Sequence, residues 1–336
     1  MTSLTVINTL RLFNNESELP FPVVDVQALT LQIEAQRKKP QTSESEVAQI
    51  LAEAAVQCMN AMLLTEARDF YAQIGKKSLN TDLQCSYQLA EARAQLLIAT
   101  KSKTSYAQFQ QTIQSIKLEK LSFDLESQTK LYGALAQILN NQQVHQASQT
   151  LIGSISTFSS DELLDFSGFA SIALLLAASN LSRKLLKALI DSQTDALASA
   201  NPPVLSLIKC IIGCNYGSFY SVLGQVKEFI RSNFWLRCIE NELIEQITSG
   251  VYQQYLQAFL VTGVQEMAQE FAQEFEQFKN QLEYFIFRGM IQARMDAVTW
   301  QIRKIEQKEC DKWWGKFLEE SLSVIAKVEV LQKGKQ

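Results

Sequence analysis

From residue 46 onward, apolar residues recur every three or four positions, and this spacing most constrains the fold. Early examples run from Val47 to Ala55 and from Leu64 to Tyr71, and comparable stretches continue to Ile155. Residues at this spacing share one face of a helix, so each stretch predicts an amphipathic helix. Short polar breaks, such as Gly75 to Ser78, separate the helices. The chain up to residue 158 is therefore predicted to be a row of helices.

The order of these helices indicates a repeat. Long and short helices alternate, with one pair every ~35–40 residues, the period of tetratricopeptide-like arrays. One pair cannot bury its apolar face alone, so stacking into a solenoid is expected; the full tetratricopeptide signature is absent, and the array is degenerate. Only 12 Gly and 5 Pro occur in 336 residues, which favours helices because both residues weaken helix interiors.

The sequence becomes more apolar after Asp161. Leu163 to Ala178 is nearly continuous apolar sequence, which predicts a helix buried on several sides, with Ser160 or Asp161 as its N-cap. Further helices are predicted over Ser182–Ile190, Val204–Ile212, Phe219–Ile230 and Trp235–Gly250.

The pattern changes near the C-terminal end. Val264–Phe271 predicts a short helix, and Phe275–Phe287 predicts a longer one that ends before Gly289. Met290–Asp296 and Val298–Ile305 alternate in the manner of strands. Two helices followed by a β-hairpin is the order of a winged helix-turn-helix, and this hairpin is the only β-structure predicted.

Lys308 to Val330 is again amphipathic, with Trp313, Phe317 and Leu322 in its apolar stripe. A terminal helix with such an uncovered stripe is expected to dock on another surface, either its own domain or a partner.

Bulk properties limit the function classes. Lys and Arg number 31 against 35 Asp and Glu, for a net charge of -4, which does not favour binding to nucleic acid or to an acidic membrane. Met1–Leu12 does not resemble a signal peptide, and the longest apolar stretch, Ile172–Ala178, is too short to span a bilayer. The six cysteines are scattered through helical patterns, as in proteins of the cytoplasm and nucleus, where thiols stay reduced.

No catalytic constellation stands out. The single histidine, His145, cannot supply the several imidazoles or thiolates of a zinc site, and any Ser-His-Asp triad would rest on it alone. Cys210 and Cys214 lie four apart on a predicted apolar helix and are expected to pack in the core. Gly213 and Gly217 lack the Lys-Ser/Thr of a phosphate loop. We therefore expect a non-enzyme with no catalytic, cofactor-binding or metal-binding residues.

The second helix of the predicted winged helix corresponds to the recognition helix of DNA-binding proteins. Its charges nearly cancel, whereas contact with phosphates needs a positive field. Aromatic residues are common at protein interfaces, so binding to protein is favoured over binding to nucleic acid. The charged residues are Glu276, Lys279, Glu283 and Arg288, and the aromatic ones are Phe275, Phe278, Tyr284, Phe285 and Phe287.

Three stretches in the C-terminal half, Leu164–Ile190, Leu207–Leu223 and Tyr252–Asp296, resemble the PCI-domain family. That family is shared by the proteasome lid, the COP9 signalosome and a translation initiation factor complex. Asn201-Pro202-Pro203 departs from the pattern, where a less interrupted helix is expected. The third stretch is the most specific and looks like subunit 1 of the COP9 signalosome.

The resemblance implies a non-catalytic scaffold subunit of the signalosome, supporting removal of Nedd8 from cullins by a separate metal-bearing subunit. It implies as partners other PCI subunits, metallo-isopeptidase subunits and cullin-based ubiquitin ligases. The alternatives are a subunit of the 26S proteasome lid, or a PCI protein of translation or mRNA export. Carried over from the family, the assembly surfaces are a sheet edge with Arg294, Asp296 and Thr299, and a terminal helix with Trp313, Phe317 and Leu322.

The predicted fold class is all-α: a helical-repeat solenoid followed by a PCI domain with a winged helix and a terminal helix. The predicted divisions are an N-terminal segment over 1–45, repeats over 46–158, and a PCI domain over 159–305. The PCI domain divides into a helical bundle over 159–250 and a winged helix over 251–305. The terminal helix takes up 306–336.

Overall fold

The computed structural model describes residues 23–39, 43–74, 81–99, 103–116, 123–140, 144–158, 164–193 and 197–304. The chain divides into two compact units, Met1–Gly250 and Val251–Gln336. The predicted terminal helix over 306–336, with Trp313, Phe317 and Leu322, lies outside the described residues.

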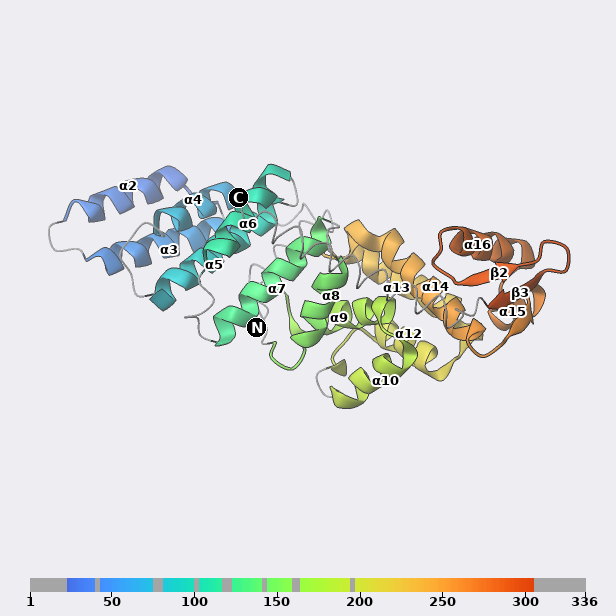
Figure 1. The fold of residues 1–336 in the computed structure, drawn as a ribbon. Helices are drawn as coiled ribbons and strands as arrows, with labels where there is room; N and C mark the ends of the chain where they lie inside the picture. The colour runs from blue at the N-terminus through green and yellow to red at the C-terminus, as the bar shows by residue number, and fades with distance from the viewer. Residues whose placement is uncertain are drawn as a thin grey trace, which may run out of the picture. The chain divides into compact units, whose positions relative to one another are not determined.

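The first half of unit 1 is a row of helices, as the spacing of apolar residues predicts. Successive helices pack against one another: α3 on α4, α4 on α5, α5 on α6 and α7 on α8 (Figure 1). Because each helix buries a stripe against its sequence neighbours, stability comes from stacking. The bounds are α3 Glu44–Asn60, α4 Leu64–Ile74, α5 Thr81–Ala99, α6 Lys103–Ser115, α7 Phe123–Leu139 and α8 Val144–Gly153.

The row begins one helix earlier than the sequence analysis predicts. Helix α2 (Val26–Arg37) packs on α3, and the carboxylate of Asp25 accepts hydrogen bonds from the first backbone N–H groups of α2. Helix α3 starts with a capping box, in which the Ser43 hydroxyl accepts from the Glu46 N–H and the Glu46 carboxylate accepts from the Ser43 N–H. These caps satisfy backbone donors that a helix start leaves free.

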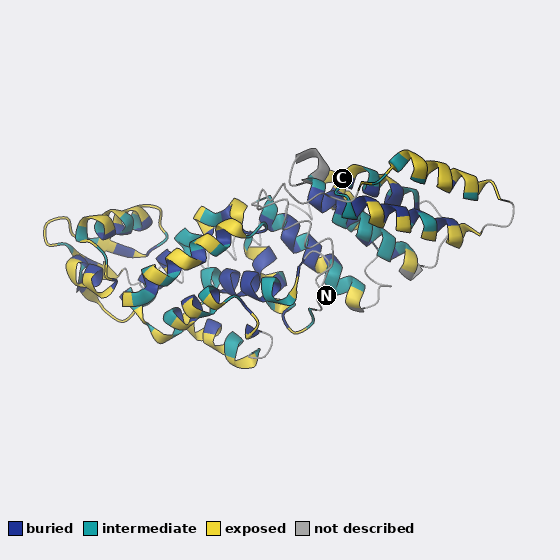
Figure 2. Cartoon of the chain, turned by 180° about the vertical axis from the view of Figure 1, so that it is seen from behind, coloured by how far each residue is buried: buried dark blue, intermediate teal, exposed yellow. Residues whose placement is uncertain are grey.

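Helix α9 (Phe166–Asn180) is the apolar centre of the second half of unit 1. Every residue from Phe169 to Ala177 is buried, and Figure 2 shows this burial in dark blue. The helix is therefore enclosed, as its composition predicts. Its predicted start was wrong, because the N-cap is Asp165, whose carboxylate accepts from the Gly168 N–H at 2.8 Å, rather than Ser160 or Asp161.

The helices after α9 follow the predicted order with altered ends. They are α10 (Arg183–Ser192), α12 (Pro202–Gly213) and α13 (Tyr216–Ser232). Helix α12 packs on α9 and also contacts α10. The N–H of Asn201 donates to the buried Ser171 hydroxyl at 2.8 Å, which fixes the start of α12 against α9. The helix predicted over Trp235–Gly250 instead opens with a 3-10 turn, η2 (Arg237–Ile239), before α14 (Glu240–Leu256).

Unit 2 has the winged-helix order that the sequence predicts, with one strand more. Strand β1 (Val261–Gly263) precedes α15 (Val264–Glu270) and α16 (Phe275–Phe287), and β2 (Ala293–Met295) and β3 (Gln301–Lys304) form the wing. The strands make an antiparallel sheet in the order β1-β3-β2. Strand β1 was not predicted, and β2 and β3 are shorter than predicted, whereas the bounds of α16 match the prediction.

No helix within the described ranges combines the length and the apolar character needed to cross a membrane.

Candidate functional site

The winged helix is built on a cluster of four buried aromatic rings. Tyr252 from α14 is fully buried, and its ring centroid lies 4.9 Å from Phe271, 4.8 Å from Phe278 and 5.8 Å from Phe285. The Tyr252 hydroxyl donates to the side-chain oxygen of Gln281 at 2.9 Å, which satisfies its polar end. This cluster holds α14, α15 and α16 together and positions their outer faces.

Trp300 fastens the wing to α16. Its backbone has a left-handed φ of 51°, and its carbonyl accepts from the Val264 N–H at 2.8 Å. The Lys279 ammonium lies 4.4 Å from the centre of the Trp300 ring and 3.1 Å from the carboxylate of Glu276. Lys279 is therefore held by two partners within the domain, and only 16% of its side chain is exposed.

The outer side of α16 is acidic and aromatic. Glu276, Glu283, Tyr284 and Phe287 are all exposed there, and Phe287 is 91% exposed. Lys279 is held inward, and the exposed Arg288 at the C-cap lies 5.4 Å from the centre of the Tyr284 ring, so the helix offers no row of cations to a phosphate backbone, and its carboxylates repel one. An exposed aromatic ring is instead a common anchor at protein interfaces. The local charge therefore favours a protein partner at this helix.

The three predicted interface residues of the wing lie at different places. Arg294 lies in β2, with its side chain exposed. Asp296 and Thr299 lie in the turn between β2 and β3, where the Asp296 carboxylate accepts from the N–H groups of Val298 and Thr299. These hydrogen bonds to the ionised form lower the pKa of Asp296. The placement of Thr299 on a strand was wrong; this residue shapes the hairpin turn.

An exposed apolar segment, which was not predicted, leads into β1. Phe259, Leu260 and Val261 are 43%, 70% and 42% exposed. The signal was present, because a run of aromatic and β-branched residues before Gly263 is typical of a short strand. Phe287 and Val298 are further exposed apolar side chains of unit 2.

His145 belongs to a structural network on α8. Its Nδ1 lies 2.9 Å from the side-chain oxygen of Asn180, and its Nε2 lies 3.1 Å from the side-chain nitrogen of Gln149. Asn180 also donates to the Ser148 hydroxyl at 3.1 Å, which ties α9 to α8. The side chain is exposed, as predicted for a surface histidine, and its contacts join two helices.

Cys210 and Cys214 are half-buried. The Cys210 sulfur lies 3.3 Å from the Ser218 hydroxyl, whereas Cys214 lies past the end of α12 with a left-handed φ of 55°. The prediction that one helix carries both cysteines was therefore wrong. Within the described ranges, no group of three or more His, Cys, Asp or Glu side chains is placed to hold a metal ion.

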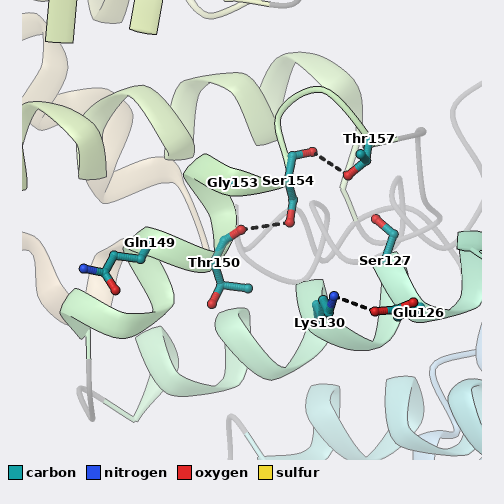
Figure 3. Close-up of a pocket in the computed structure, with 8 residues that line it drawn as sticks. All are labelled: Glu126, Ser127, Lys130, Gln149, Thr150, Gly153, Ser154 and Thr157. Atoms are coloured by element: carbon teal, nitrogen blue, oxygen red, sulfur yellow. Dashed lines mark hydrogen bonds and ion pairs between the residues drawn. The ribbon is translucent and has the colours of Figure 1, made fainter. Parts of the chain in front are cut away.

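A polar hollow lies between α7 and α8 (Figure 3). Its charged groups, Lys130 and Glu126, pair with each other at 2.6 Å. The hydroxyls of Ser154 and Thr157 donate to the backbone carbonyls of Thr150 and Ser154 at 2.8 Å and 3.2 Å. These groups are engaged with one another, and they form no acid-base pair or activated nucleophile. The remaining lining residues are Ser127, Gln149 and Gly153.

Comparison with known proteins gives relatives that include three proteasome regulatory subunits. A 26S proteasome non-ATPase regulatory subunit 6 from Dictyostelium discoideum is 20% identical over 222 residues, which are 66% of this chain and 58% of that protein. The subunit 6 of Oryza sativa subsp. japonica is 24% identical over 156 residues, or 46% of this chain and 40% of the relative. A subunit 6 homolog from Arabidopsis thaliana is 23% identical over 179 residues, or 53% and 46%. No family model matches the sequence.

The chain spans about half the length of the curated relatives it matches. The matches support the resemblance to PCI-domain subunits at low identity, and they do not support subunit 1 of the COP9 signalosome in particular. The proteasome subunit, which the sequence analysis kept as an alternative, fits these comparisons better.

Proposed function

We propose that this chain is a non-catalytic scaffold subunit of a multi-subunit complex of the proteasome regulatory type. The observation that carries the proposal is the outer side of α16, where Glu276, Glu283, Tyr284 and Phe287 are exposed and Lys279 is held by Trp300. Such a surface suits a protein partner better than a phosphate backbone. The similarity to proteasome non-ATPase regulatory subunits supports the same kind of role. Its place of action is then the cytoplasm and nucleus.

The wing offers a backbone surface for joining a neighbour. Strands β1 and β2 are the outer strands of the sheet. Asp296 donates its N–H to the Gln301 carbonyl at 2.9 Å, so the alternation of an antiparallel ladder directs the N–H of Met295 away from β3. A strand of a neighbouring subunit can add to such an edge. Arg294, on β2, and Asp296, in the turn, flank this edge. Trp313, Phe317 and Leu322 remain the second proposed surface, from sequence alone.

Affinity purification of the tagged full chain, followed by mass spectrometry, tests the proposal. Recovery of proteasome ATPase and non-ATPase subunits is expected. Recovery of cullins with a metallo-isopeptidase would instead restore the signalosome assignment. Recovery of ribosomal or mRNA-export proteins, lost after nuclease treatment, would favour the translation or export alternative. Recovery of no stoichiometric partner would refute the scaffold role.

The edge of β2 is tested by Met295→Pro, which removes the outward N–H without removing a hydrogen bond to β3. We expect this variant to lose its partners while keeping its helical circular dichroism. The matched control, Met295→Ala, keeps the N–H and should keep the partners. Equal recovery with both variants would exclude this edge.

A further inference from the structure

One face of the wing sheet is open, and a basic row crosses it. Thr262 of β1 pairs with Ile302 of β3, and both are buried toward the helices. Neighbouring positions on a strand point to opposite faces, so the adjacent row points outward. This row consists of Val261, Arg303 and Arg294, one from each strand, and all three are exposed.

The two arginines lie directly opposite each other. Arg294 pairs with Arg303 in the register of β2 and β3, and they form a hydrogen-bonded pair with Cα atoms about 5.5 Å apart. Like charges in this position repel each other and destabilise the sheet. Among the described residues, neither guanidinium has an ion pair or hydrogen bond that offsets this repulsion. Within the described part of the chain, this pairing of like charges is therefore unfavourable.

The charges of unit 2 are also segregated. The cations Arg288, Arg294, Arg303 and Lys304 lie on the wing strands or at the entrance to them. Among the described residues of unit 2, the carboxylates lie on or next to the two helices, at Glu266, Glu270, Glu274, Glu276 and Glu283, except for that of Asp296 in the turn between β2 and β3. Because few carboxylates accompany the strands, a carboxylate from another molecule meets little repulsion at the open face.

We propose that the open face of the wing sheet binds an acidic, extended segment of a neighbouring subunit, with Arg294 and Arg303 as its two anchors. The inference rests on the proposed scaffold function and names the chemistry of one partner segment. Guanidinium groups pair with carboxylates through two parallel hydrogen bonds. In an extended segment, alternate side chains lie roughly 7 Å apart on one side. An acidic residue at every second position thus matches the two arginines, and an apolar residue beside them covers Val261.

A protein segment fits this face better than a nucleic acid does. The positive charge is confined to a few side chains, and the Asp296 carboxylate lies at the adjacent turn. The acidic side of α16 opposes the approach of a continuous phosphate backbone. Val261 in the row, and the exposed Phe259 and Leu260 that precede it, add apolar area, which an acidic segment with apolar residues can cover.

Binding of defined probes to the full chain tests the inference by fluorescence anisotropy at low salt. The probes are a short peptide of alternating Glu and Val, the same peptide with Gln for Glu, and a single-stranded DNA oligonucleotide. We expect binding of the Glu peptide, weakened about tenfold or more in Arg294→Gln/Arg303→Gln, because each such pair contributes a charge-assisted hydrogen bond. Arg294→Lys/Arg303→Lys should restore part of the affinity. The control, Lys184→Gln/Lys187→Gln on α10, removes the same charge elsewhere and should leave binding unchanged.

Equal affinity for the Glu and Gln peptides would overturn the inference. So would an affinity for the Glu peptide that is the same in the wild type and in Arg294→Gln/Arg303→Gln. Arginine-dependent binding of the DNA that exceeds binding of the Glu peptide would also overturn it, in favour of nucleic acid. Co-purification separates this failure from failure of the proposed function. If the tagged chain recovers no partner subunits, the scaffold role fails. If the wild-type chain and Arg294→Gln/Arg303→Gln recover the same subunits equally, only the acidic-segment inference fails.

Discussion

The aromatic cluster of the winged helix predicts a large local loss of stability for Phe278→Ala. The Phe278 side chain is 1% exposed, and its ring lies 4.8 Å from Tyr252 and 5.6 Å from Phe271. Removing a ring from such a site forfeits its burial and leaves a cavity, which costs about 3–5 kcal/mol. Phe287 provides the matched control, because it lies on the same helix and is 91% exposed. Phe287→Ala should change the local stability by less than about 0.5 kcal/mol.

Hydrogen-exchange mass spectrometry measures this loss where it occurs, without requiring two-state unfolding of the whole chain. Since about 1.4 kcal/mol is a factor of ten, protection of amides in α15 and α16 should fall more than about a hundredfold in Phe278→Ala. Peptides from α3 to α5 should keep their protection, because they belong to unit 1. Protection within tenfold of wild type in α16, or an equal loss in Phe287→Ala, would refute the proposed core.

Three further predictions concern single residues. Ala272 has a left-handed φ of 50°, so Ala272→Gly should raise the urea midpoint, with a gain of about 1 kcal/mol. Ser43→Ala removes the capping box of α3 and should cost about 1 kcal/mol in hydrogen-exchange protection of that helix, whereas Ser45→Ala should cost little. Burial raises the pKa of the Cys58 thiol from 9.0 to about 11. As the pH rises, the thiol ionises in the unfolded chain before it ionises in the folded chain, which favours unfolding. The urea midpoint of the wild type should therefore decrease as the pH is raised from 9 to 11, relative to the midpoint of Cys58→Ala. Parallel pH profiles of the two proteins would contradict this.

The helical body follows from the sequence because its signals are repeated over many turns. The bounds of α16 match the prediction, since Phe278, Leu282 and Phe285 are buried at helical spacing. Helix starts are less predictable. Ser160, Asp161 and Asp165 all have side chains that can cap a helix, so residue type alone does not identify the N-cap. In the structure the N-cap of α9 is Asp165.

The strands and the turn of the wing are the elements that sequence patterns predict least well. Strand β1 has only three residues, too few for an alternation to stand out between two helices. The turn of Asp296 to Trp300 depends on a left-handed Trp300, a conformation that composition does not predict because Trp rarely adopts it. Arg294 lies in the edge strand β2, as expected, and the register adds that it pairs with Arg303 of β3. That pairing could not be read from the sequence, because it requires the register.

The proposed scaffold role is tested by asking whether the tagged full chain is part of a larger particle in cell extract. The extract is compared before and after nuclease treatment. Sedimentation of the extract shows whether the chain migrates alone or within a larger particle. We expect a nuclease-resistant particle much larger than the 37.9 kDa chain, containing subunits of the proteasome regulatory type. Migration as a free chain, or a particle that collapses when nucleic acid is digested, would contradict it.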